Sequence, residues 1–191
     1  MLENPKEREN IIDILNKAKK ALQEDNVILL KQLSNRTVHT ASIYKDVDSI
    51  LVAVTVYALS KIIERKNFEK HKSWPNFFSV CIKNIELAEQ NVRQNNVKEF
   101  RDNLVEIRKA AEKLSGNLKK YITDIFERAA VNKASRLYEH GLSLSETAEL
   151  FGITQWELAE YVGRTGISDV DLSLTMPIKE RINFTKKLFE K

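Results

Sequence analysis

Apolar residues recur at intervals of three and four along most of this chain, which is the spacing of one face of an α-helix. Such stripes occupy residues 5–33, 47–66, 74–94, 97–114 and 118–129. The first stripe predicts one long amphipathic helix with a kink or an interruption at Asp25 and Asn26, and Asn95 with Asn96 separates the third stripe from the fourth. The pattern predicts an all-α protein built on a helical bundle of four to five helices. The heptad seam of residues 97–114 suits antiparallel packing.

The segment 47–66 is apolar on nearly every face, which is typical of a central helix. Its Val, Ile and Thr residues are also strand formers, so a strand is the alternative. The lack of turn residues over this length favours the helix, with Asp46 or Asp48 as its cap. Pro75 fits the first turn of the next helix, where its missing N–H does no harm.

Residues 34–45 are rich in hydroxyl and amide side chains and have no helical period. They predict a link between helices that is longer than usual, and long links are more often functional. Arg36, His39 and Lys45 lie in it, together with Tyr44 and several hydroxyls, a set that could hold a phosphate or a carboxylate. The alternative is a solvated connection whose hydroxyls form local turns.

Residues 133–169 predict three short helical segments, with joints at Gly141 and Gly152. Capping-box spacing, which opens a helix, occurs at Ser143 with Glu146 and at Thr154 with Glu157. Two helices joined by a short turn containing Gly form a helix-turn-helix. Its interior needs a small residue at the helix crossing and larger apolar ones around it, which are supplied by Ala148 and by Phe151, Ile153, Leu158 and Tyr161.

Residues 144–162, LSETAELFGITQWELAEYV, resemble a family of small uncharacterised prokaryotic proteins that is largely archaeal. These proteins are often grouped with the antitoxins of toxin–antitoxin pairs. The resemblance rests mainly on Ala148, Gly152, Trp156 and Glu157. It implies an antitoxin-like protein that binds DNA or a protein partner, with a toxin as one candidate partner.

The expected organisation is a helical bundle over residues 1–131, a helix-turn-helix over 132–169 and a C-terminal amphipathic helix within 170–191 that starts at Pro177. The stripe at 118–129 can continue unbroken into 133–140, in which case bundle and helix-turn-helix share one helix. Composition, with 42% apolar and 30% charged residues, is that of a globular protein without a membrane partner. The single Cys81 fits a reducing, cytoplasmic location.

Charge is distributed unevenly along the chain. Residues 133–169 hold three basic and six acidic side chains, so the segment most like a DNA reader carries a net charge of −3. Residues 34–73 carry a net charge of +3 and are the better electrostatic candidate for phosphate. The candidate phosphate contacts in this region are Arg36, His39, Lys45, Lys61, Arg65, Lys66 and Lys70.

No pattern of catalytic or metal-binding residues emerges. His39, His71 and His140 lie far apart, and none has a second metal ligand at helical spacing. The chain has no phosphate-cradling glycine loop and no nucleophile or zinc-protease motif. We expect no enzymatic activity, no metal and no cofactor.

Three hypotheses for function follow from these patterns. The first is a DNA-binding transcriptional regulator or antitoxin-like protein, acting as a homodimer. The second is an adaptor whose degenerate helix-turn-helix binds a protein through Trp156; in a third, the 36–45 link binds a small ligand or phosphate. The candidate DNA- or partner-binding residues are Thr154, Gln155, Trp156, Glu160 and Arg164. The bland alternative for Trp156 is that it folds back onto Tyr161 or the bundle.

Overall fold

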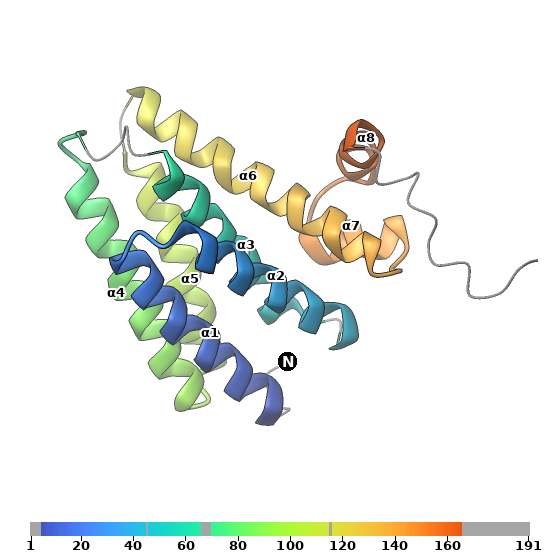
Figure 1. Cartoon of the computed structure of the whole chain (residues 1–191), viewed down its shortest axis with the longest axis horizontal. Coiled ribbons are helices and arrows are strands. Elements are labelled where there is room, and N and C mark those ends of the chain that lie inside the picture. Colours follow the sequence, from blue (N-terminus) through green and yellow to red (C-terminus); the bar gives the residue numbers. More distant parts are fainter. Residues whose placement is uncertain (1–4, 45, 66–69, 115, 166–191) are drawn as a thin grey trace, which may run out of the picture.

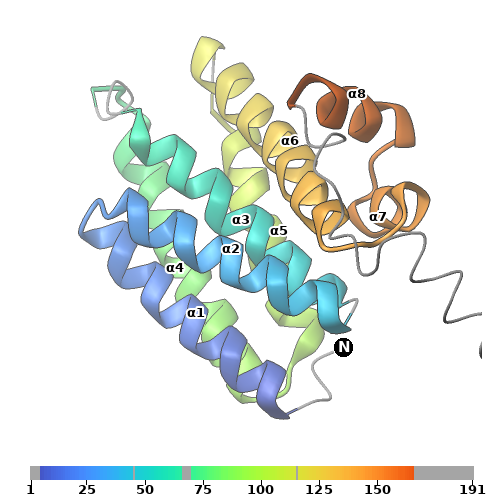
Figure 2. The same ribbon diagram turned by 45° about the vertical axis from the view of Figure 1, so that its right-hand side comes forward.

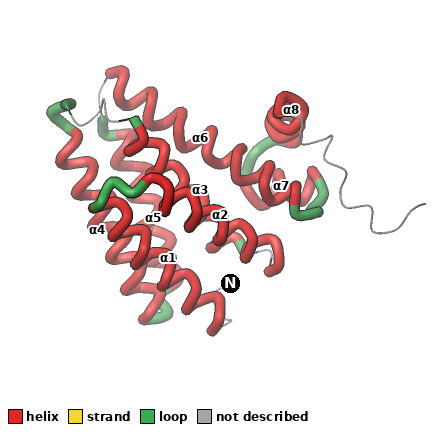
Figure 3. The backbone as a smooth tube through the Cα atoms, in the orientation of Figure 1, coloured by secondary structure: helices red, strands yellow, loops and turns green. Residues whose placement is uncertain are grey.

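The computed structural model describes residues 5–44, 46–65, 70–114 and 116–165. These residues form eight helices and no strand, which confirms the predicted all-α class (Figures 1 and 3). The C-terminal helix expected from Pro177 lies outside the described residues.

The first apolar stripe forms two antiparallel helices, α1 (Pro5–Gln23) and α2 (Val27–Tyr44). The expectation of one long helix is therefore wrong, whereas the interruption considered at Asp25 and Asn26 is present. Asp25 takes a left-handed backbone with φ of 52°, and the Asn26 side chain accepts a hydrogen bond from the Leu29 N–H at 3.0 Å. A local break of this kind lets α2 fold back along α1 and bury the apolar faces of both.

The prediction that residues 34–45 form a link is wrong, because residues up to Tyr44 belong to α2. Hydroxyl side chains in this segment donate to backbone carbonyls of the preceding turn, as Thr37 does to Leu33 at 2.8 Å, and so fit inside a helix. Ser34 donates instead to the Ala53 carbonyl of the neighbouring helix at 2.7 Å. Buried Val38 and Ala41 anchor the same face, so packing outweighs the low helix propensity of the segment.

The central segment is the helix α3 (Val47–Glu64), as preferred over a strand. Asp46 caps it by accepting from the Ser49 N–H at 2.9 Å. The Asp48 carboxylate is fully buried and accepts two hydrogen bonds from Arg101, at 2.5 and 3.0 Å. Arg101 lies on α5 (Val97–Glu112), which pairs with α4 (Trp74–Arg93) across a turn where Asn95 has φ of 61°.

A single 24-residue helix, α6 (Gly116–Glu139), runs from the bundle into the helix-turn-helix. Figures 1 and 2 show it lying along the bundle, with the last two helices packed at its C-terminal end. The continuation predicted from residues 118–129 into 133–140 is therefore confirmed. The proposed domain boundary between residues 131 and 132 falls inside this helix.

The last two described helices, α7 (Leu144–Phe151) and α8 (Gln155–Thr165), have the predicted start signals. The Ser143 hydroxyl accepts from the Glu146 N–H at 3.2 Å, which caps α7. Gly152 ends α7 with a left-handed φ of 63°, a conformation that glycine adopts without strain. Gly141, with φ of 95°, lies in the turn between α6 and α7, so both predicted joints are present.

A small apolar core holds α7 and α8 against the end of α6. Its buried members are Ala134, Ala148, Leu158 and Val162. Ala148 is 2% exposed, so it occupies the crossing position that the sequence assigns to it. Phe151 and Ile153 pack around this core as half-buried residues.

Replacing Ala148 with leucine should overpack this crossing. We expect Ala148→Leu to lower the free energy of unfolding by about 1–3 kcal/mol, because a close-packed core has no space for three more carbon atoms. Thermal and urea unfolding measure this loss. Glu149→Leu, which places the same side chain at an exposed position of α7, serves as the matched control and should change stability little. Equal stability of the two variants would contradict the packing described for Ala148.

Candidate functional site

The exposed face of α8 carries the residues that the sequence singles out for binding. Thr154 and Glu157 complete the second predicted capping box: the Thr154 hydroxyl accepts from the Glu157 N–H at 3.1 Å, and the Glu157 carboxylate accepts from the Thr154 N–H at 2.8 Å. The Thr154 hydroxyl also donates to the Glu157 carboxylate at 2.7 Å, and this bond, followed by the one from the Thr154 N–H, lowers the pKa of Glu157 and keeps it charged. Gln155 donates to the Ser145 hydroxyl at 3.2 Å, a bond that also ties α8 to the start of α7.

Trp156 points into solvent, with 87% of its surface exposed. The alternative that it folds back onto Tyr161 or the bundle is wrong. Tyr161 instead lies half-buried and accepts a hydrogen bond from the Asn132 side chain of α6 at 2.8 Å. Leu158 and Val162 are the residues of α8 that are buried in the apolar core. Trp156 lies on the opposite face of the helix and is therefore exposed.

The surface around Trp156 is acidic. Residues 142–165 contain four glutamates and one arginine. That arginine, Arg164, pairs with Glu160 one turn earlier on α8. Within the described residues 142–165, the one arginine is therefore already paired, and the carboxylates of this segment repel phosphate.

The structure does not gather the predicted phosphate contacts into one site. Arg36 pairs with Asp13 of α1 at 2.6 Å, whereas Lys61 on α3 pairs with Glu64 at 2.8 Å. Arg65 lies with its guanidinium carbon 4.9 Å from the centroid of the Tyr121 ring. Lys70 is exposed ahead of α4, and Lys45 and Lys66 lie outside the described residues.

His39, the last of the candidate phosphate contacts, lies beside His140, which is far from it in the sequence. Its ring lies 5.2 Å from the ring of His140, centroid to centroid, where the last turns of α2 and α6 meet. Within the part of the chain that the structure describes, no group of three or more His, Cys, Asp or Glu side chains could hold a metal ion. The pair is a helix-to-helix contact without a third ligand.

Sequence reasoning missed a buried lysine on α6. Lys133 is only 2% exposed, and its ammonium donates to the Asn35 side-chain oxygen of α2 at 2.9 Å. The same nitrogen lies 3.8 Å from the centroid of the Tyr57 ring of α3, in cation–π geometry. A signal was present in the pattern, because Lys133 continues the apolar stripe of Phe126 and Ala129 at the next helical step.

Burial and neighbouring cations destabilise the charge on this lysine. Burial has the largest effect, followed by the positive charges of Arg136 and Lys61, and together they lower the pKa of Lys133 to about 8. We call the set Asn35, Tyr57, Lys61, Lys133 and Arg136 the Lys133 cluster; it joins α2, α3 and α6.

Comparison of the chain with protein-family models, with curated proteins and with solved structures finds no match. The resemblance of residues 144–162 to antitoxin-like proteins therefore stays a prediction. Among the helices described here, none has both the length and the apolar character needed to cross a membrane.

The shifted pKa of Lys133 predicts an unusual dependence of stability on pH. Below about pH 8 both folded and unfolded states carry the ammonium charge, and the folded state bears the cost of burying it. Between about pH 8 and the ordinary lysine value of 10.5, only the unfolded state still holds the proton. The free energy of unfolding should therefore rise through this window, by roughly 3 kcal/mol at most.

Urea unfolding at pH values from 7 to 10 gives the free energy of unfolding of the native protein and of Lys133→Met. The contribution of Lys133 is the rise seen in the native protein and missing from the variant. Burial raises the pKa of Tyr57 and opposes stability at the alkaline end, but Tyr57 is common to both proteins and cancels. Lys120→Met, at an exposed position of the same helix, is the control that should keep the rise. If the free energy of unfolding of Lys133→Met rose with pH as much as that of the native protein, the lowered pKa of Lys133 would be refuted.

Proposed function

We propose that this protein is a non-enzymatic adaptor that binds a protein partner through the exposed face of α8. The observation that carries the proposal is Trp156, 87% exposed at the start of that helix. A large aromatic side chain in water has a high free energy that docking into an apolar pocket relieves. Tryptophan is also among the residues that contribute most to the affinity of protein interfaces.

The charges around Trp156 indicate the chemistry of the partner. Glu157 and Glu160 neighbour it on α8, and Glu149 adds an exposed carboxylate on α7. A partner with an apolar pocket bordered by Lys and Arg would be complementary to this surface. A basic nuclease, such as the toxin of an antitoxin-like pair, has this character, which is what the resemblance of residues 144–162 also suggests.

The second candidate is a DNA-binding regulator acting as a homodimer. It is favoured by one observation: both helices of the helix-turn-helix start at a side-chain cap, and the start of α8 is open to solvent. In DNA-bound helix-turn-helix proteins, that end of the second helix contacts bases, and dimers match paired half-sites. The acidic surface of α8 is the reason for placing this candidate second, because phosphate contacts provide most of the affinity for DNA.

Photocrosslinking in the native cell discriminates the two. A benzoylphenylalanine placed at position 156 should crosslink to one protein, and the same group in place of Glu99, an exposed residue of α5, is the control. With that partner purified, Trp156→Ala should weaken binding at least about tenfold, whereas Glu99→Ala on α5 should change the affinity little. Trp156 is almost fully exposed, so its removal should leave the fold and its unfolding free energy intact.

Two results would overturn the adaptor. The first is the absence of any crosslinked protein beyond those captured from position 99. The second is a short duplex that binds at low salt and is lost with Gln155→Ala, which would support the DNA-binding regulator instead.

A further inference from the structure

The Lys133 cluster lies at a junction of three helices, away from Trp156. Lys31 and Lys61 both pair with Glu64, at 2.5 and 2.8 Å, and Arg136 pairs with Glu139 at 2.8 Å. Lys133 differs from these cations, because no carboxylate of the described residues lies within ion-pair distance of its nitrogen. Three cations thus share two carboxylates, and the fourth cation, buried Lys133, pairs with neither.

Burying the Lys133 charge without a carboxylate partner destabilises the folded state, which is not expected of a residue that only supports the fold. A methionine or leucine at position 133 would fill the same space without the cost of burying a charge. The neighbouring Arg136 and Lys61 increase that cost by repelling the ammonium. A bound anion would remove the imbalance, since it would face several cations at once.

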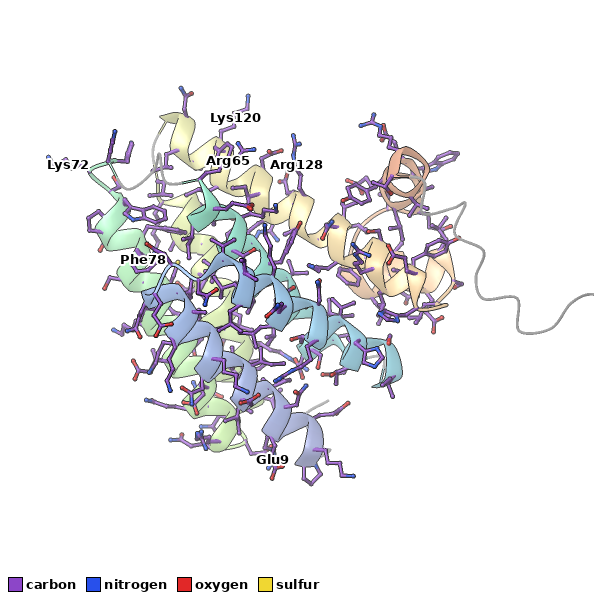
Figure 4. All side chains as sticks on the ribbon, viewed as in Figure 1. Glu9, Arg65, Lys72, Phe78, Lys120 and Arg128 are labelled. Atoms are coloured by element: carbon purple, nitrogen blue, oxygen red, sulfur yellow. The ribbon has the colours of Figure 1, made fainter. Side chains whose placement is uncertain are left out.

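The donors that an anion would meet are at the surface near Lys133: the Lys61 ammonium lies 5.7 Å from the centroid of the same Tyr57 ring, and Arg136 follows Lys133 by one turn of α6. The Arg136 side chain is 55% exposed and that of Lys61 is 38% exposed, while Asn35 is exposed on α2. Guanidinium, ammonium and amide groups from three helices therefore surround the buried charge. Arg65 follows Lys61 by one turn of α3, and its guanidinium carbon lies 4.9 Å from the centroid of the Tyr121 ring of α6, where these two helices meet (Figure 4).

We propose that the Lys133 cluster binds a phosphate group, with Arg136 and Lys61 as its direct donors and Lys133 as the fixed charge beneath it. A phosphate monoester carries close to two negative charges, which matches the excess of two cations over the carboxylates of the surrounding pairs. Its several acceptor oxygens suit a forked guanidinium together with ammonium donors. The phosphate belongs either to a small free molecule or to a nucleic-acid backbone.

The direct test follows the side-chain ¹³Cε signal of Lys133 by NMR during titration with inorganic phosphate, with sodium chloride at equal ionic strength as the reference. Saturable binding should raise the pKa of Lys133 by about one unit, because a nearby anion favours the charged form. Arg136→Gln should weaken phosphate binding about tenfold. Arg128→Gln removes the same charge from an exposed position of α6, where Arg128 pairs with Asp124, and should leave the affinity unchanged.

A second arm identifies the source of the phosphate. A short duplex DNA that binds at least ten times more tightly per molecule than inorganic phosphate, and that depends on Arg136, assigns the site to a nucleic-acid backbone. Tighter binding of inorganic phosphate or a mononucleotide assigns it to a free ligand. No saturable change at Lys133 with any of these probes, or equal losses in Arg136→Gln and Arg128→Gln, would overturn the proposal. Both substitutions are at the surface, so the comparison does not depend on a variant of buried Lys133.

Discussion

The packing of α6 is the constraint on which the rest of the described structure depends. Its part up to residue 129 contributes Ile122, Phe126 and Ala129 to the core of the bundle. Further along the same helix, Leu137 joins the cluster beneath α2 and α3, and Ala134 joins the core of the helix-turn-helix. Among the described helices, α6 alone supplies buried residues to all three apolar clusters. The positions of Trp156 and of Lys133 therefore follow from one continuous helix.

Two surfaces of opposite charge lie on the elements that α6 connects. The helix-turn-helix offers an acidic face with an exposed aromatic anchor, while the junction of α2, α3 and α6 holds cations in excess of carboxylates. Asn132 and Lys133 are neighbours on α6, yet one bonds Tyr161 of α8 and the other contacts Tyr57 of α3. An anion at the Lys133 cluster would thus lie next to the helix that positions α8. The two proposed activities share a rigid element but use different residues.

Features encoded by local chemistry could be predicted from the sequence. The cap residues Ser143 and Thr154 and the left-handed Gly152 mark helix ends whatever the tertiary context, and the structure has them as predicted. Residues 34–44 could not be assigned in this way, since hydroxyl side chains support either a turn or a helix and only the buried contacts of Ser34 and Val38 decide between them. The His39–His140 contact and the Lys133 cluster depend on helices that meet across long stretches of chain, which a one-dimensional pattern does not encode.

Native-state hydrogen exchange of the α6 amides tests most directly whether the bundle and the helix-turn-helix share one helix. If they do, amides from residue 122 to 137 should exchange slowly and lose their protection together, with opening free energies close to that of global unfolding. Fast exchange confined to residues 130–132, with slow exchange on either side, would show a hinge at that point. That result would contradict the shared helix, and with it the fixed relation between the Lys133 cluster and α8.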